Sequence, residues 1–141
     1  DLIISNPPFF DNHSKASITL RQIARHTDQL PYSALIEITD RLLKQDGLFY
    51  LLIPVHAVER IMEEASKAGL FLIKRIDYRG YSRNQAKVST LLFSRKADVL
   101  EENVLTIYRS EQVYSEESEQ YLKPFLLRFS DLTLQIQKRP Y

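Results

Sequence analysis

The chain alternates between short runs of consecutive apolar residues and longer stretches in which apolar residues recur every three or four positions. Residues 2–4 and 48–53 are uninterrupted apolar runs, which are typical of strands buried on both faces of a parallel sheet. Residues 31–47 and 55–69 have the helical spacing. The order strand, helix, strand, helix, strand predicts an α/β fold in which helices wind a parallel sheet.

The two helical stretches carry recognisable signals at their ends. Pro31 suits the first position of a helix, and Gly47 is expected to end that helix in a left-handed conformation. The apolar stripe expected to face the core consists of Ala34, Leu35, Ile38 and Leu42. In the second helix Gly69 is the expected cap, and the residues expected to face inward are Val58, Ile61, Met62, Ala65 and Ala68.

Further strands are predicted at residues 70–78 and 87–95, the second of which alternates strictly. The polar link 79–86 is too short for a crossover helix, so these strands are expected to be antiparallel and to form the last pair of the sheet. Residues 104–108 are expected to form an edge strand, and Ser115 is expected to cap a terminal helix.

The first strand ends at the sequence Ser5-Asn6-Pro7-Pro8-Phe9, which predicts a rigid corner. Each proline fixes its own φ and drives the preceding residue out of the helical region, so Asn6 and Pro7 are held extended. The prolines also lack an N–H, so the corner presents carbonyl oxygens with few donors beside them. In open α/β sheets, ligands bind at this carboxyl edge of the strands.

The corner suits a planar ligand that bears an NH2 group. The Asn6 carboxamide oxygen and the Pro7 carbonyl oxygen would accept the two protons of the amine, and the Phe9 ring would stack on the planar group. Drawing both protons out of the plane localises the nitrogen lone pair, so the amine can attack a methyl sulfonium without a strong general base. The alternative is that Asn-Pro-Pro is a turn that only ends a strand.

Residues 1–9 resemble the catalytic Asn-Pro-Pro-aromatic motif of amino-methylating, S-adenosylmethionine-dependent methyltransferases. The resemblance continues through 24–27 (Ala-Arg-His-Thr), 47–54 and 114–129. Together these segments resemble the bacterial tRNA1(Val) adenine-N6-methyltransferase family. The resemblance implies methyl transfer from S-adenosyl-L-methionine to the N6 amine of an adenine in tRNA, the anticodon-loop adenine 37.

The resemblance also implies the roles of particular residues and the extent of the domain. The catalytic residues that it implies are Asn6, Pro7, Pro8 and Phe9. Asn6 is also expected to contact the cofactor, and Arg25 is expected to contact RNA. The implied fold is the carboxyl-terminal half of a Rossmann-like class I methyltransferase sheet, mostly parallel with one antiparallel strand. Residues 1–129 would form this catalytic half, and residues 130–141 a tail.

Methyltransferases of this class bind their cofactor in a glycine-rich turn after one strand and with an acidic residue after the next. The three glycines of this chain, Gly47, Gly69 and Gly80, are far apart and form no such turn. We therefore expect the chain to be the carboxyl-terminal portion of a larger enzyme, without the main cofactor-binding half; a natural half-protein is the alternative. The strand at residues 2–4 would then be an exposed apolar edge that favours self-association.

Basic residues in two parts of the chain are candidate RNA contacts: Lys15, Arg21, Arg25, Arg79, Arg83 and Lys87. The first three lie within residues 15–29, beside the corner. The other three surround the predicted hairpin, within a region (74–96) whose charge balance is +6, and Tyr78 and Tyr81 lie among them. Cations suit phosphates and aromatic rings suit unstacked bases. The alternative is that both are ordinary solvated surfaces.

The composition narrows the class of protein. The chain has 141 residues, enough for one domain, and its 44% hydrophobic and 26% charged residues are ordinary globular values. The absence of cysteine excludes disulfides and thiolate metal sites and suits a cytoplasmic protein. No apolar stretch is long enough to span a bilayer, and His13 and His26 have no metal-ligand spacing. We therefore expect neither a membrane nor a metal partner.

Three other functions fit the same residues. The Asn-Pro-Pro-aromatic corner also serves glutamine methylation in release factors and guanine-N2 methylation in ribosomal RNA, because both substrates present an NH2 beside a planar group. A chain without the cofactor-binding half would instead be an RNA-binding module without catalysis.

Overall fold

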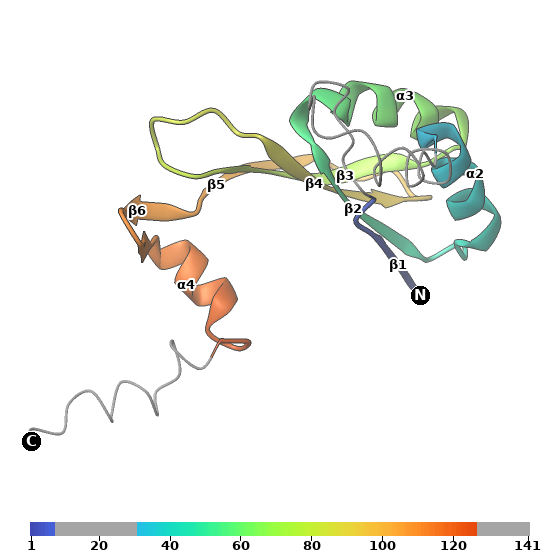
Figure 1. Cartoon of the computed structure of the whole chain (residues 1–141). Coiled ribbons are helices and arrows are strands. Elements are labelled where there is room, and N and C mark those ends of the chain that lie inside the picture. The colour runs from blue at the N-terminus through green and yellow to red at the C-terminus, as the bar shows by residue number, and fades with distance from the viewer. Residues whose placement is uncertain (8–30, 127–141) are drawn as a thin grey trace, which may run out of the picture.

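The computed structural model describes residues 1–7 and 31–126, which form an α/β fold around one five-stranded sheet. In spatial order β1-β2-β4-β3-β5, the strands are β1 (Leu2–Ser5), β2 (Leu48–Pro54), β4 (Val88–Ser94), β3 (Phe71–Arg79) and β5 (Glu101–Thr106). The β1–β2 and β3–β5 pairs are parallel, whereas β4 is antiparallel to both of its neighbours. The predicted sheet, mostly parallel with one antiparallel strand, is confirmed (Figure 1).

The reversed strand is not at the end of the sheet, where the sequence analysis had expected the last pair. The crossover through the helix after β2 places β3 one strand away from β2, and β4 fills the space between them. Because β4 then has a partner on each side, the chain continues to the free side of β3, where β5 pairs with it from Lys74↔Glu101 to Arg79↔Thr106. The predicted edge strand is thus confirmed, and it begins three residues earlier than expected.

The hydrophobic core lies between the sheet and the helices α2 (Tyr32–Leu42) and α3 (Val58–Lys67), which cover one face of it (Figure 1). A short 3-10 helix, η1 (Val55–Ala57), leads from β2 into α3. Alternate residues of the central strands face these helices and are fully or nearly fully buried: Phe49, Leu51, Ile53, Leu91 and Phe93. The Phe49 and Phe93 rings stack with their centroids 6.0 Å apart.

The first helix differs from its prediction at its end and in its buried face. It ends at Leu42, and Gly47 is not in the left-handed conformation; a Cβ there would lie 2.8 Å from Cδ1 of Leu43, so a side chain would require Leu43 to shift. The predicted stripe was partly wrong, because Ile38 and Leu42 are exposed. The helix is rotated so that it buries Leu35, Ile36, Thr39 and Leu43. Both stripes have helical spacing, and the sequence pattern alone does not choose between them.

The second helix agrees more closely with its prediction. Val58, Ile61 and Ala65 are buried, and Gly69 follows the helix with a φ of 70°, as expected of a left-handed cap. Met62, predicted to fill the core, is instead 38% exposed. Its flexible side chain lies at the border of the buried stripe.

The first strand is not buried on both faces, as its apolar run had predicted. The side chains of Leu2 and Ile4 are 56% and 69% exposed, and within residues 1–7 and 31–126 the strand β1 pairs with β2 alone. The alternative expectation, an exposed apolar edge at residues 2–4, is confirmed.

The chain after the sheet forms a small separate unit with β6 (Tyr108–Ser110), β7 (Val113–Tyr114) and α4 (Glu116–Leu122) (Figure 1). Ser115 caps α4 as predicted, because its Oγ accepts a hydrogen bond from the Ser118 backbone N–H at 3.1 Å. The hydroxyl of Ser118 in turn donates to the Thr106 carbonyl at 3.4 Å, which ties α4 to β5. Among the described residues, no helix is long and apolar enough to cross a membrane.

Candidate functional site

The corner after β1 and the loop between β3 and β4 lie at the same edge of the sheet. Because β1, β2, β3 and β5 run in one direction, all four end at this edge, at Ser5, Pro54, Arg79 and Thr106. Asn6 and Pro7 follow β1 there, and the β3–β4 loop (residues 80–87) begins there. The structure therefore brings together the two candidate regions that the sequence places more than seventy residues apart.

Asn6 is exposed at this edge, and Pro7 is half-buried. The register that pairs Ser5 with Leu51 places Asn6 level with Leu52 of β2. The remaining site residues predicted near the corner lie outside the described residues: Pro8, Phe9, Lys15, Arg21 and Arg25. Their catalytic and RNA-binding roles stay predictions.

The β3–β4 loop presents both of its predicted cations to solvent. The Arg83 guanidinium lies over the Tyr81 ring, with its carbon 5.5 Å from the ring centroid, and Lys87 is exposed. The backbone of Lys87 anchors the end of the loop, since its N–H donates to the Tyr78 carbonyl and its carbonyl accepts from the Val55 N–H. The loop is thus held between β2 and β3 while its charged tips remain accessible.

Arg79 and Arg75 are engaged within the sheet. Nε of Arg79 donates to Oγ1 of Thr106 at 2.8 Å, which joins the ends of β3 and β5. Arg75, four residues earlier on β3, bonds to a neighbour on the same strand. Its guanidinium binds the Asp77 carboxylate through two nitrogens and lies on the helix-covered face of the sheet.

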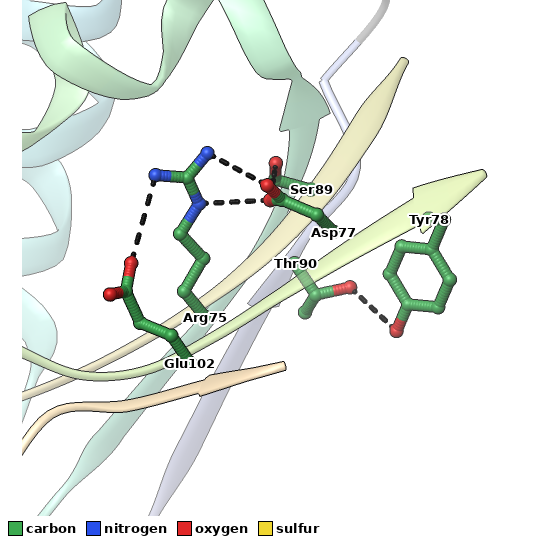
Figure 2. Close-up of polar contacts among 6 residues, drawn as sticks. All are labelled: Arg75, Asp77, Tyr78, Ser89, Thr90 and Glu102. Carbon is green, nitrogen blue, oxygen red and sulfur yellow. Dashed lines mark hydrogen bonds and ion pairs between the residues drawn. The ribbon is translucent and has the colours of Figure 1, made fainter. Parts of the chain in front are cut away.

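The Arg75–Asp77 pair belongs to a polar network that joins three strands (Figure 2). Ser89 of β4 donates to Asp77 at 2.5 Å, and Glu102 of β5 lies 3.9 Å from Arg75. Burial opposes ionisation of Asp77, but the hydrogen bonds from Arg75 and Ser89 outweigh it and lower the pKa of this carboxyl. The network therefore holds a charged carboxylate on the face that α3 covers.

A tyrosine cluster that the sequence analysis did not identify connects the loop to the β6–β7 unit. The ring centroids of Tyr81 and Tyr108 are 5.7 Å apart, and those of Tyr108 and Tyr114 are 4.9 Å apart. The Tyr108 N–H also donates to the Gly80 carbonyl at 2.8 Å. The only available sequence signal was the abundance of tyrosine, eight in the chain, because the cluster depends on long-range contacts.

A pocket of about 630 Å³ opens at the same edge, on the face of the sheet opposite the helices. Its lining consists of Leu52, Tyr78, Gly80, Asn84, Gln85, Lys87, Val88 and Ile107. Figure 2 shows Tyr78 and Thr90 together on this side, where Oγ1 of Thr90 donates to the Tyr78 hydroxyl at 3.0 Å. Burial raises the pKa of Tyr78 above its ordinary value, so its hydroxyl stays neutral at physiological pH.

The described residues offer little to hold a nucleoside cofactor. Gly47 precedes β2, Gly69 follows α3 and Gly80 follows β3, so no two glycines share a turn. No group of three potential metal ligands occurs within residues 1–7 and 31–126. Asn6 stays the one cofactor contact that we predict.

No family model matches the chain, but several curated proteins are similar to it and share one name. Proteins of Flavobacterium psychrophilum, Trichodesmium erythraeum and Tolumonas auensis are 34%, 34% and 35% identical to it over 91–92% of its length. Each is named tRNA1(Val) (adenine(37)-N6)-methyltransferase. The chain spans only 54–55% of these relatives.

Among solved structures, an Agrobacterium tumefaciens protein described as a predicted O-methyltransferase has a similar fold, with a TM-score of 0.60 over 84% of this chain and 49% of that one. The two are 11% identical in sequence, so this likeness concerns the fold alone. The names of the curated relatives agree with the family resemblance found in the sequence. The chain is therefore a relative of the tRNA1(Val) (adenine(37)-N6)-methyltransferases, of whose length it spans about half.

Proposed function

We propose that the protein methylates the N6 amine of an adenine in tRNA, with S-adenosyl-L-methionine as the methyl donor. The observation that carries this proposal is the position of Asn6 and Pro7 at the carboxyl edge of the parallel strands, on the same edge as the basic β3–β4 loop. The names of the relatives support adenine 37 of tRNA1(Val) as the target. Residues 1–129 would form the catalytic half, and residues 130–141 a tail.

In this proposal the corner orients the amine. The Asn6 carboxamide oxygen and the Pro7 carbonyl oxygen each accept a hydrogen bond from one N–H of the amine. These bonds localise the nitrogen lone pair and make the amine the nucleophile. Pro8 fixes the corner and Phe9 stacks on the adenine. The exposure of Asn6 supports the proposal, because a carboxamide turned into the core would be inaccessible to a base.

S-adenosyl-L-methionine, when bound, supplies an electrophilic methyl group. Apart from Asn6, the described residues do not fit its main binding site, because they contain no glycine-rich turn after a strand. The proposal therefore places those contacts in sequence that this chain does not contain. The chain alone should show no tight binding of the methyl donor in calorimetry.

The substrate side of the edge suits a single-stranded RNA loop. A loop base costs only a few kcal/mol to extrude, and stacking on an aromatic ring such as Phe9 returns about 1–3 kcal/mol. Arg83 and Lys87 present exposed cations that would neutralise flanking phosphates. A tRNA substrate would also place the protein in the cytoplasm.

Two other methyl acceptors remain as alternatives, guanine N2 in ribosomal RNA and a glutamine in a release factor, and so does an RNA-binding role without catalysis. The names of the relatives favour adenine in tRNA over all three. The deciding experiment offers labelled methyl donor and the protein at its natural full length to bulk tRNA, ribosomal RNA and release factor. Label in N6-methyladenine of tRNA is expected, and label confined to another acceptor would refute the proposal.

The exposed edge of β1 is the proposed site of self-association. Leu2 and Ile4 are exposed, and in the described part of the chain β1 pairs with β2 only. An unpaired apolar edge strand is a template for pairing with a second chain. We propose that the isolated chain associates through this strand.

A further inference from the structure

The pocket beside the β3–β4 loop contains none of the residues to which we assign methyl transfer, Asn6 to Phe9. It nevertheless opens on the same edge of the sheet as Asn6. Leu52, which lines it, is level with Asn6 on the neighbouring strand. Adjacent strands lie about 4.8 Å apart, so the lining residues on β2, β4 and β3 lie one, two and three strand spacings, or about 5, 10 and 14 Å, from β1. A ligand that extends from the corner across the sheet edge would reach them.

We propose that this pocket binds an unpaired nucleobase of the RNA strand that carries the methylated adenine, close to that adenine in sequence. The inference rests on the proposed function and extends it, because it assigns a second base-binding site to the edge. Its volume of about 630 Å³ lies in the range of roughly 300–1,000 Å³ that is typical of small-molecule sites.

The walls of the pocket suit a flat, uncharged ring. Leu52, Val88 and Ile107 provide apolar surface, and the Tyr78 side chain contributes an aromatic ring. Thr90 donates a hydrogen bond to the Tyr78 hydroxyl, and Lys87 is the one charged residue of the lining. Aromatic surfaces of this kind bind unstacked bases irrespective of their identity.

The rim of the pocket suits the polar parts of a nucleotide. Asn84 and Gln85 are exposed and carry carboxamides, which donate and accept hydrogen bonds and so match the edge of a base. Lys87 brings an exposed ammonium to the same rim, where a phosphate would lie. An apolar interior with a single cation at the mouth matches a neutral base on an anionic backbone.

The test couples a protein change to an RNA change. Val88→Phe on β4 would fill the pocket with a residue that strands tolerate, and Leu92→Phe is the matched control. Leu92 lies on the same strand and the same face, four residues or about 14 Å away. Thermal melting of both variants checks that they fold.

The chain and its variants are titrated with fluorescent anticodon stem–loop RNA in which single nucleotides next to the target adenine are replaced by abasic nucleotides. For wild type and Leu92→Phe, removal of one flanking base is expected to weaken binding about fivefold to 150-fold. For folded Val88→Phe, the intact and the abasic RNA should bind equally.

An equal penalty for the abasic RNA in Val88→Phe and in wild type would overturn the inference, as would no RNA binding by the wild-type chain. Failure of the proposed function would look different. The protein would then leave adenine unmethylated in the acceptor assay, while the coupling between Val88 and the flanking base would persist.

Discussion

Nε of Arg79 donates a hydrogen bond to Oγ1 of Thr106 at 2.8 Å, and this bond joins the ends of two parallel strands. Arg79 was predicted from the sequence as an RNA contact beside Arg83 and Lys87. Its bond to Thr106 also gives it a structural role at the edge where the candidate site lies. Arg79 therefore differs from Arg83 and Lys87, whose side chains are exposed on the loop.

Replacing Arg79 should lower stability more than replacing Arg83 does. In Arg79→Ala the loss of the bond to Thr106 should lower the free energy of unfolding by about 1 kcal/mol. Arg83→Ala removes an exposed guanidinium whose one described contact is the Tyr81 ring, so its free energy of unfolding should stay within about 0.5 kcal/mol of wild type. Urea unfolding followed by circular dichroism measures both, and equal stability of the two variants would argue against the distinction.

The exposed loop cations should govern the salt dependence of RNA binding. Arg83→Ala and Lys87→Ala are each expected to flatten the slope of log K against log salt by about 0.7, the value for one phosphate contact of a single strand. Lys67→Ala is the control, because Lys67 is an exposed cation on α3, where it forms an ion pair with Glu64 of the same helix. Fluorescence anisotropy at several salt concentrations gives the slopes. An identical slope in Lys87→Ala and Lys67→Ala would show that Lys87 does not contact an RNA phosphate.

Asp77 should make folding stability depend on acid pH. Its folded-state pKa is lowered, so it contributes stability above its unfolded pKa of about 3.9, and this contribution is lost as the pH falls through the folded value. Asp77→Asn should cost about 1–3 kcal/mol at neutral pH, since it deprives Arg75 of its carboxylate.

The difference in unfolding free energy between wild type and Asp77→Asn should be constant from pH 5 to 7 and shrink below about pH 4. Chemical unfolding of both proteins across this range measures it. Using the difference cancels the titration of the other carboxylates. A difference that grows as the pH falls would contradict the assigned sign.

Self-association should depend on the edge of β1. Ile4→Lys places a charge on that edge and is expected to shift the chain toward monomer in sedimentation velocity. Ile38→Lys is the control, because Ile38 is also an exposed isoleucine but lies on the helix α2. Monomeric wild-type chain over the whole concentration range would exclude the association itself.

The sequence predicted which segments form strands and that β3 and β4 are antiparallel, because that information is local. Apolar runs mark β1 and β2, the alternation of residues 88–93 marks β4, and a short link forces β3 and β4 to be antiparallel. The buried face of α2 was predicted incorrectly, because Leu35 belongs to two possible stripes and only the packing against β2 and β4 selects one. The position of β5 beside β3 likewise depends on β4, which already occupies the other side of β3. A local sequence pattern does not contain this information.

The candidate site was predictable where the chemistry is carried by one short segment. Asn6 and Pro7 lie at the sheet edge expected of them, and the β3–β4 loop is the predicted hairpin. The structural bond of Arg79, the tyrosine cluster and the pocket could not be predicted, since each joins residues distant in the sequence. The tie between Gly80 and Tyr108 is an example of such a contact.

The most direct measurement compares turnover and RNA affinity in Asn6→Ala, in the protein at its natural full length. Turnover should fall about 100-fold or more, because one of the two oxygens that orient the amine is lost, while the dissociation constant for tRNA should stay within about threefold of wild type. Asn103→Ala, at an exposed asparagine on β5, should leave both unchanged. Wild-type turnover in Asn6→Ala would contradict the role of the corner.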